Sequence, residues 1–387
     1  MDCSRPLGLS RNQSRNEARN EIATSKRIVI KIGSSSLTGS AGAQLNPAAV
    51  DGLVDLVVAA RKRGSEVVVV SSGAIAAGLA PLGLKVRPYE LAMQQAAASV
   101  GQGLLIHRYT ESLARHSLTA SQILLTTEDL VRRSHYKNVQ QTLNRLLSLG
   151  VVPIINENDT VGTQEIRFGD NDRLAALVAL LIGADLLILI SDIDGLYSAP
   201  PAKLGAKRIT DVKSLAEIQD ISLGGVGNSG VGSGGMVTKV EAARIVTRAG
   251  IPMLLTSLEQ AGAAILGEEC GTYFHAQDSK TNSRMLWLEH ASTPHGRLVI
   301  DAGAVLALVE KNVSLLPAGV IGVEGEFSAG DAVEIGDESG AIIARGLVAF
   351  DSLEIPQMMG RSTKDLAKEL GSEYGRELIH RDDLVLL

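Results

Sequence analysis

Short, uninterrupted runs of apolar residues recur along the first two thirds of the chain, and each ends in small or polar residues. The runs are RIVIKIGSSS at 27–36, EVVVVSSGA at 66–74, VVPIINENDT at 151–160, LLILISDIDG at 186–195 and IPMLLTS at 251–257. Since side chains alternate between the two faces of a strand, a run without alternation predicts a strand that is buried on both faces. Such strands are typical of parallel sheets covered by helices.

Helical patterns separate these runs. Residues 47–63 begin with a proline and end in a basic triplet before Gly64, a suitable start and stop for a helix. Residues 237–249 place apolar side chains on one face, and Gly250 follows as a stop. The alternation of strand and helix predicts a doubly wound, mainly parallel α/β sheet between helices from about 26 to 258.

One segment, LAALVALLIGADLLILI at 174–190, has the hydropathy of a membrane span. It is short for a span, and Gly183 and Asp185 interrupt it. We therefore predict a helix, a Gly-Ala-Asp turn and a buried strand, with no membrane association.

The pattern changes after about residue 290. Short apolar stretches with glycine turns and little helix between them predict a small β-barrel over 295–387. Residues 26–290 then form the α/β domain. Residues 1–25 are polar and rich in Arg, Asn and Ser, which predicts a disordered extension.

Composition narrows the function classes. Aromatic residues make up 3% of the 387 residues, so stacking platforms for single-stranded nucleic acid are not expected. A net charge of -6 gives no general attraction to nucleic acid or acidic membranes. Cys3 and Cys270 provide neither a disulfide framework nor a metal-ligand cluster, which predicts a cytoplasmic protein.

Candidate chemistry gathers where the predicted strands end, because ligands bind beyond the carboxyl ends of parallel strands. These ends carry Lys31, Ser72, Asp159, Ser191 and Asp192. Serine, asparagine and aspartate at one sheet edge would form a polar floor that suits a phosphate group.

The segment FGDNDRL at 168–174 places Asp170, Asn171 and Asp172 in a row before a helix. One such residue would be explained as a helix cap, worth about 1 kcal/mol. Three in a row exceed what a cap requires, so we predict a functional role for them.

The stretch GVGSGGMVTK at 230–239 is either a linker or a phosphate site. It is no Walker loop, because Lys239 does not directly follow a glycine. A glycine-rich turn that leads into a helix lets backbone N–H groups approach an anion. A lysine in the first turn opposes the helix dipole, and an anion at the same place would explain it. Together with Lys31, this pattern favours phosphoryl transfer, whose acceptor these arguments leave open.

Six motifs in order resemble the glutamate 5-kinase family of the amino acid kinase superfamily, in its long form with a C-terminal PUA domain. They are KIGSSSLTG at 31–39, SSGAIAAG at 71–78, INENDTV at 155–161, FGDNDRLAAL at 168–177, SDIDGLY at 191–197 and GSGGMVTKVEAA at 232–243. The resemblance covers the chain from about residue 26 to its end.

The resemblance implies that ATP phosphorylates the γ-carboxylate of L-glutamate to L-glutamyl 5-phosphate, the first step of proline biosynthesis. Lys31 and Lys239 would hold the transferring phosphoryl group, and Asp172 would orient both lysines. The glutamate site implied in the same way comprises Ser72, Asp159, Asp170 and Asn171, with Asp159 at the α-ammonium group. The attacking carboxylate is already ionised at neutral pH, so no general base is needed.

The resemblance also implies a nucleotide site, on the side of the transferring phosphoryl group that is opposite to glutamate. It comprises Lys31, Ser191, Asp192, Ser233, Gly234, Gly235, Met236, Val237, Thr238 and Lys239. Mg²⁺ would ride mainly on the ATP phosphates, and no side chain is assigned as its ligand.

Further partners also follow only from the resemblance: proline as a feedback inhibitor, a homo-oligomer, and a downstream glutamyl phosphate reductase. Residues 90–116 are expected to pack in the core, with a subunit interface as a second use. PUA modules elsewhere bind RNA, but residues 295–387 contain eight lysines and arginines against sixteen aspartates and glutamates. This balance favours a regulatory or assembly role over RNA binding.

Three alternatives remain beside this interpretation. Another amino acid kinase, acting on aspartate, N-acetylglutamate or UMP, would share the nucleotide half, but INENDTV and the PUA-like tail favour glutamate. An RNA-binding protein would leave the paired lysines unexplained. A sensor without activity would have lost Lys31, Lys239 or Asp172, and all three are present.

Overall fold

A computed structural model describes residues 19–38, 44–126, 129–130, 133–161, 171–201, 203, 205–218, 235–277, 294–311 and 313–387. The chain divides into two compact units. The larger comprises residues 1–126 and 140–280, and the smaller comprises 127–139 and 281–387.

The larger unit is built on an eight-stranded sheet with the order β3-β4-β2-β1-β5-β9-β10-β8. Its strands are β1 (Arg27–Ile32), β2 (Glu66–Ser71), β3 (Ala120–Leu125), β4 (Val152–Glu157), β5 (Leu186–Ser191), β8 (Asp211–Val212), β9 (Met253–Ser257) and β10 (Thr272–Phe274). Neighbouring strands from β3 to β9 are parallel, and β10 runs antiparallel to β9. The five apolar runs correspond to β1, β2, β4, β5 and β9, so the predicted mainly parallel sheet is confirmed.

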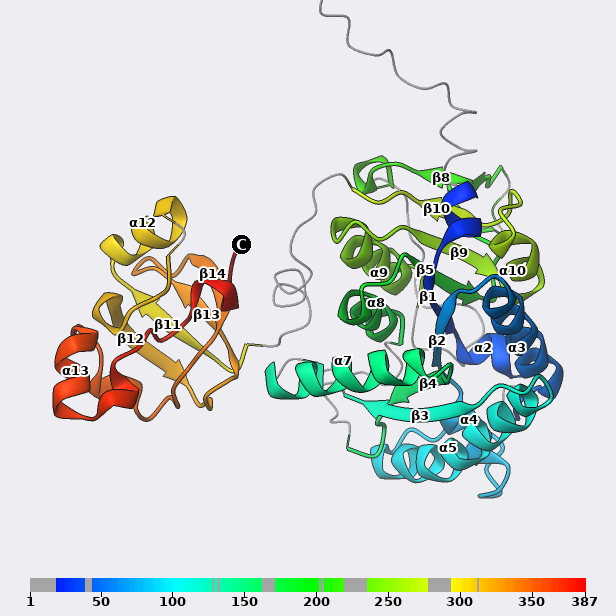
Figure 1. Ribbon diagram of the computed structural model, residues 1–387, viewed down its shortest axis with the longest axis horizontal. Helices are drawn as coiled ribbons and strands as arrows, with labels where there is room; N and C mark the ends of the chain where they lie inside the picture. Colours follow the sequence, from blue (N-terminus) through cyan, green and yellow to red (C-terminus); the bar gives the residue numbers. More distant parts are fainter. Residues whose placement is uncertain are drawn as a thin grey trace, which may run out of the picture. The chain divides into compact units, whose positions relative to one another are not determined.

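Helices cover both faces of this sheet. They are α2 (Ser34–Leu37), α3 (Pro47–Lys62), α4 (Ala74–Leu79), α5 (Leu91–Ala114), α7 (Arg133–Ser148), α8 (Asn171–Ile182), α9 (Met236–Arg248) and α10 (Leu258–Ile265). In Figure 1, α8 and α9 lie side by side on one face of β1 and β5, and α3 and α10 lie on the other. This is the doubly wound arrangement expected from the alternation of elements.

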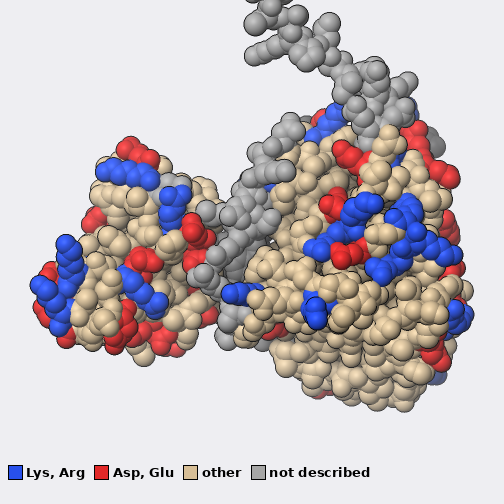
Figure 2. All heavy atoms as spheres, in the orientation of Figure 1, with Lys and Arg blue, Asp and Glu red and all other residues tan. Residues whose placement is uncertain are grey.

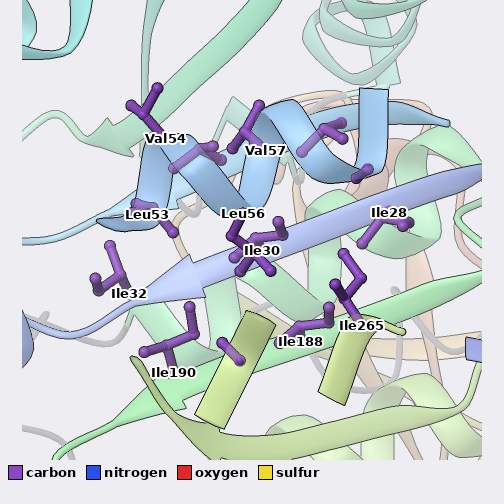
Figure 3. Packing of buried hydrophobic residues seen from close by; sticks show 14 of the residues in the cluster. Ile28, Ile30, Ile32, Leu53, Val54, Leu56, Val57, Ile188, Ile190 and Ile265 are labelled. Atoms are coloured by element: carbon purple, nitrogen blue, oxygen red, sulfur yellow. The ribbon is translucent and has the colours of Figure 1, made fainter. Parts of the chain in front are cut away.

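Alternation along β1 divides its side chains between the two layers. Ile28, Ile30 and Ile32 pack against α3, where Leu53 and Leu56 meet them (Figure 3). The intervening residue Lys31 must then point to the opposite face, where α8 lies. The strand that anchors the core therefore also delivers a lysine toward α8.

The segment at 174–190 folds as predicted. Its first part continues α8, a turn at Gly183 follows with a φ of 61°, and the strand β5 is buried throughout. In the described part of the chain, no helix combines the length and the apolar character of a membrane span.

The first described residues, 19–25, differ from the expectation of disorder through residue 25. Residues 19–24 are helical, and the side chain of Ile22 is completely buried in the core of the larger unit. Arg19 donates to the carbonyl of Cys270 at 2.9 Å, and Tyr273 donates to Glu21 at 2.7 Å. One apolar anchor and two polar contacts thus order a segment whose composition predicted disorder; residues 1–18 lie outside the described residues.

Several short elements were not predicted. They are the edge strand β3, a hairpin of β6 (Leu196–Tyr197) and β7 (Arg208–Ile209), the strands β8 and β10, and the 3-10 helix η1 (Leu215–Ile218). Except for β3, each strand has only two or three residues, too few for a periodic pattern in the sequence.

The smaller unit contains a five-stranded sheet with the order β12-β11-β13-β14-β15. Its elements are β11 (Gly296–Ile300), α12 (Ala302–Lys311), η2 (Pro317–Gly319), β12 (Val320–Gly325), β13 (Ala332–Gly336), β14 (Ile342–Leu347), η3 (Ile355–Gln357), α13 (Thr363–Glu369), η4 (Ser372–Tyr374), η5 (Arg381–Asp383) and β15 (Leu384–Leu386).

The prediction of a strand-rich C-terminal domain is confirmed, but the expectation of little helix was wrong for α12. Asp301 accepts a hydrogen bond from the backbone N–H of Ala304 at 2.7 Å and so caps a ten-residue helix directly after β11. The expected boundary at 290–296 falls largely in 278–293, outside the described residues.

Candidate active site

Three charged side chains meet at the carboxyl edge of the sheet. Nζ of Lys31 on β1 lies 2.5 Å from Oδ1 of Asp172, in the first turn of α8. Nζ of Lys239, in the first turn of α9, lies 3.2 Å from Oδ2 of the same carboxylate. The exposed fractions of Lys31, Asp172 and Lys239 are 5%, 1% and 7%, so all three charges are held away from bulk water. The structure thus brings together the three residues that were predicted to handle the phosphoryl group.

Two ammonium groups control the ionisation of Asp172 in this cluster. Burial alone would raise the pKa of Asp172, but the ammonium groups of Lys31 and Lys239 hold it well below its usual range. The carboxylate is therefore ionised throughout the neutral range. The triplet therefore holds one ionised carboxylate and two ammonium groups, at the edge where ligands bind in such sheets.

Thr238 has a contact that the sequence did not predict. Its hydroxyl lies 2.8 Å from Oδ2 of Asp172 and 2.9 Å from the carbonyl oxygen of Gly235. A hydroxyl has one proton, so it donates to one of these acceptors at a time. The sequence predicted a nucleotide-binding role for Thr238, and the structure places it against the carboxylate that organises the lysines.

Polar side chains of a second group surround Asn171, which directly precedes Asp172 in α8. Nδ2 of Asn171 donates to Oγ of Ser72 at 2.8 Å, and it lies 3.2 Å from Oδ1 of Asn156. Nδ2 of Asn156 donates to Oε1 of Gln102 at 2.7 Å. Oδ1 of Asn171 is buried and has no hydrogen-bond partner among the described residues. A buried acceptor without a donor is costly, which marks this atom as a contact point for a ligand.

Asp159 follows β4 and belongs to the same region of the chain. The pKa of Asp159 is raised to about 7, mainly by burial and also by the nearby carboxylate of Glu157, while the charge of Arg87 acts in the opposite direction. A carboxyl group with a pKa near 7 is only partly ionised at neutral pH, and a cation that binds beside it stabilises its ionised form. The α-ammonium group of an amino acid is such a cation.

The residues predicted for the nucleotide are only partly described. Ser191 is buried at the end of β5, and its hydroxyl donates to the exposed Asp192 at 2.9 Å. Gly235 and Met236 lead into α9, and Val237 is exposed. The predicted residues Asp170, Ser233 and Gly234 lie outside the described residues.

Sequence reasoning missed two residues of the site. Gln102 lies in the middle of α5, where its neighbours are small residues that suggest nothing but packing. Arg87 lies in the irregular segment before α5 and acts on Asp159 through its charge. Neither residue belongs to a recognisable pattern, because its role depends on which strand end folds against it.

The described side chains do not form a metal cage. No group of three His, Cys, Asp or Glu residues in the described ranges is arranged to hold a metal ion. Asp172 is already occupied by two ammonium groups.

Comparisons with known proteins identify the family of this chain. The amino acid kinase family matches residues 26–257, and the PUA domain matches residues 296–370. The chain is 58% identical to the glutamate 5-kinase of Streptomyces avermitilis over 367 residues, which cover 95% of this chain and 98% of that protein. The corresponding proteins of Streptomyces coelicolor and Thermobifida fusca are each 57% identical, with 95% of this chain covered and 98% and 95% of theirs. The chain belongs to the amino acid kinase family and, within it, to the glutamate 5-kinases with a C-terminal PUA domain.

Proposed function

We propose that this protein transfers the γ-phosphoryl group of ATP to the γ-carboxylate of L-glutamate and forms L-glutamyl 5-phosphate, the first step of proline biosynthesis. The observation that carries this proposal is the buried ion triplet, in which Asp172 holds Lys31 and Lys239 within 3.2 Å of one carboxylate. Relatives named glutamate 5-kinase are more than 50% identical to this chain, and the match covers nearly their whole length.

The transfer follows from the charges at the triplet. An oxygen of the γ-carboxylate attacks the γ-phosphorus of ATP, a new O–P bond forms, and the bond to the bridging oxygen breaks, so that ADP leaves with the electron pair. No proton has to move, because a glutamate side chain is ionised at neutral pH. Lys31 and Lys239 stabilise the negative charge on the transferring group, and Asp172 keeps both ammonium groups in place.

The acceptor end favours an amino acid. Asp159 supplies a carboxylate that an ammonium group would stabilise, and Asn171 supplies a buried carbonyl oxygen without a donor among the described residues. Ser72 keeps its own hydroxyl proton for a ligand, because its oxygen accepts from Asn171. These three groups suit the α-amino acid portion of glutamate, while its γ-carboxylate extends toward the lysines.

Mg²⁺ would enter with the nucleotide and supply positive charge against the phosphates. The described residues offer it no cage of their own, so binding through the phosphate oxygens fits this chain. The chain's own contribution at this point is the pair of lysines.

The test is an acyl phosphate assay with purified protein, ATP and Mg²⁺, in which hydroxylamine traps the product as a hydroxamate. L-Glutamate, L-aspartate and N-acetyl-L-glutamate are supplied separately. We expect hydroxamate from glutamate alone, and Lys239→Met should reduce its rate by roughly 100-fold or more. Arg244→Met is the matched control, because Arg244 is an exposed cation on the same helix. Hydroxamate from another acceptor would replace the substrate, and none from any acceptor would contradict the proposal.

A homo-oligomer is proposed on the exposed face of α5, formed by Ala92, Met93, Ala96, Ser99, Val100, Gly103 and Leu104. Met93, Val100 and Leu104 are apolar yet exposed by 38%, 40% and 43%. The neighbouring β3 is an edge strand without a charged residue, which soluble proteins usually avoid. Figure 2 shows a broad uncharged surface at the lower part of the larger unit, where α5 and β3 lie in Figure 1. A second copy can cover this face, since an edge strand pairs with its own copy around a two-fold axis.

Light scattering after size exclusion tests this interface. The wild type should have a mass at least twice the 40.6 kDa of one chain. Leu104→Glu should lower that mass, whereas Leu353→Glu, at a position that is 90% exposed in the smaller unit, should not. A monomeric wild type would contradict the proposal.

The remaining partners are proposals that rest on the same reaction. L-Proline, which shares the ammonium and carboxylate groups of glutamate, would act as a feedback inhibitor at the glutamate site. The acyl phosphate is labile in water, so a downstream reductase would gain from capturing it directly. The acidic PUA domain is proposed to act in regulation or assembly rather than in RNA binding. The cytoplasmic location stays a prediction from the sequence.

A further inference from the structure

Gln102 is not part of any motif, but it ends a chain of hydrogen bonds that begins at the acceptor site. The chain runs from Ser72 through Asn171 and Asn156 to Gln102, with contacts of 2.8, 3.2 and 2.7 Å. It connects the second strand end, α8, the fourth strand and α5. Gln102 thus links a helix of small residues to the groups proposed to bind glutamate.

The direction of these hydrogen bonds decides what Asn171 presents to a ligand. A carboxamide has one acceptor oxygen and one donor nitrogen, so rotation by 180° exchanges the two. Among the described residues, Nδ2 of Asn171 contacts three atoms that can accept a hydrogen bond: the Ser72 hydroxyl oxygen, the Ser71 carbonyl oxygen at 3.4 Å and Oδ1 of Asn156. Its Oδ1 is therefore left as a buried acceptor.

The other end of the chain supports the same direction. While Oδ1 of Asn156 faces Asn171, Nδ2 of Asn156 points to the other side, and an acceptor there stabilises this orientation. Oε1 of Gln102 is that acceptor. A side chain without an acceptor at position 102 would leave the Asn156 amide free to rotate, and Asn171 could then turn its nitrogen toward the ligand.

We propose that Gln102 is a positioning residue for substrate recognition: through Asn156 it fixes Asn171 with its carbonyl oxygen toward the site, where that oxygen accepts a hydrogen bond from the α-ammonium group of the amino acid. This inference deepens the proposed function and rests on it. An ammonium ion has three donors and no acceptor, so only the observed orientation of Asn171 can serve it.

Two variants of Gln102 separate this role from a structural one. Gln102→Met has a similar length and no strong acceptor, and it should raise KM for glutamate about tenfold with kcat and KM for ATP unchanged. Gln102→Glu keeps an acceptor and should restore KM to within about threefold of the wild type. Glu111→Gln, at an exposed position on the same helix, is the control for changes to α5.

Glutarate, which is glutamate without its amino group, identifies the group that Asn171 meets. Its inhibition constant against glutamate should be the same for the wild type and Gln102→Met. Glutarate has no ammonium group, so its binding does not depend on the orientation of Asn171. Three results for Gln102→Met would overturn the proposal. They are an inhibition constant for glutarate that rises as much as KM for glutamate, an unchanged KM for glutamate, and a fall in kcat together with a rise in KM for ATP. A wild type that makes no hydroxamate from glutamate would instead contradict the proposed function, so the two failures are distinguishable.

Discussion

Asp172 and Asp159 are both aspartates at the carboxyl edge of one sheet, and they are held in opposite electrostatic states. Asp172 is buried between two lysines, which keep its pKa well below the usual range. Burial and the charge of Glu157 disfavour the ionised form of Asp159, and its pKa rises to about 7. The end proposed to bind the phosphoryl group is therefore organised before any ligand arrives, whereas the end proposed to bind the amino acid would be completed by the ligand.

This difference assigns separate tasks to the two ends. Catalysis of phosphoryl transfer depends on charges that are already in place, because reorganisation during the reaction would raise the barrier. An amino acid binds more tightly to a site whose buried carboxylate and carbonyl oxygen lack donors when the site is empty, because the ligand supplies those donors. Substitutions at the first end should act on kcat, and substitutions at the second end should act on KM for glutamate.

The largest effect is expected from Asp172→Asn. Two buried ammonium groups would lose their shared counter-charge, so we expect kcat to fall by about 1,000-fold. Thermal unfolding should also occur at a lower temperature, because a broken buried ion pair costs about 3–5 kcal/mol. Glutamate binding, measured by calorimetry on the folded variant, should change far less than kcat. A variant with nearly normal kcat would contradict the role of the triplet.

Asp159→Asn should affect the other end of the site. Loss of the carboxylate that is proposed to meet the α-ammonium group should raise KM for glutamate by about 30- to 100-fold, the range for a charged hydrogen bond in a binding site. KM for ATP should stay within about twofold, since the nucleotide lies beyond the phosphoryl group. Steady-state kinetics with each substrate varied in turn gives both values. A loss confined to kcat would show that the two ends are not separate.

The pH dependence distinguishes the two carboxylates in the wild type. Below pH 7, free Asp159 is protonated, and glutamate binding has to displace that proton. KM for glutamate should therefore rise as pH falls, approaching about tenfold per unit well below pH 7. In Asp159→Asn this slope should disappear between pH 5 and 7. Asp172 adds no slope in this range, because its pKa lies far below it. A flat KM in the wild type would exclude the proposed linkage.

The sequence predicted much of this site because each of its three charged residues lies in a short pattern that can be recognised by itself. Lys31 lies near the end of β1, and Asp172 and Lys239 lie in the first turns of α8 and α9. The doubly wound topology brings these ends together. Gln102 and Arg87 could not be found in this way. Their roles depend on how α5 and the segment before it fold against β4, a contact between distant segments that no local pattern records.

The same limit explains the N-terminal residues. Composition describes an average over a segment, and residues 1–25 are polar on average. A single side chain, Ile22, is completely buried in the core, and residues 19–24 form a helix around it. One well-placed apolar residue can order a segment when the rest of the domain supplies its pocket.

The smallest expected effect is that of Asp159→Asn on stability without ligands, and its sign is opposite to that of Asp172→Asn. Because the folded pKa of Asp159 lies above its unfolded value, ionisation costs stability, and this cost grows between about pH 4 and 7. Asp159→Asn should therefore raise the melting temperature at pH 8 by about 2 °C, with no gain at pH 4. Asp172 has a lowered pKa, so its contribution is present above about pH 4 and is lost on acidification. Asp172→Asn should accordingly lower the melting temperature at pH 8, and calorimetry at both pH values would show whether the two aspartates differ in sign. Destabilisation at pH 8 by both variants would mean that Asp159 is already neutralised in the empty site, and that the amino acid end is organised in advance as well.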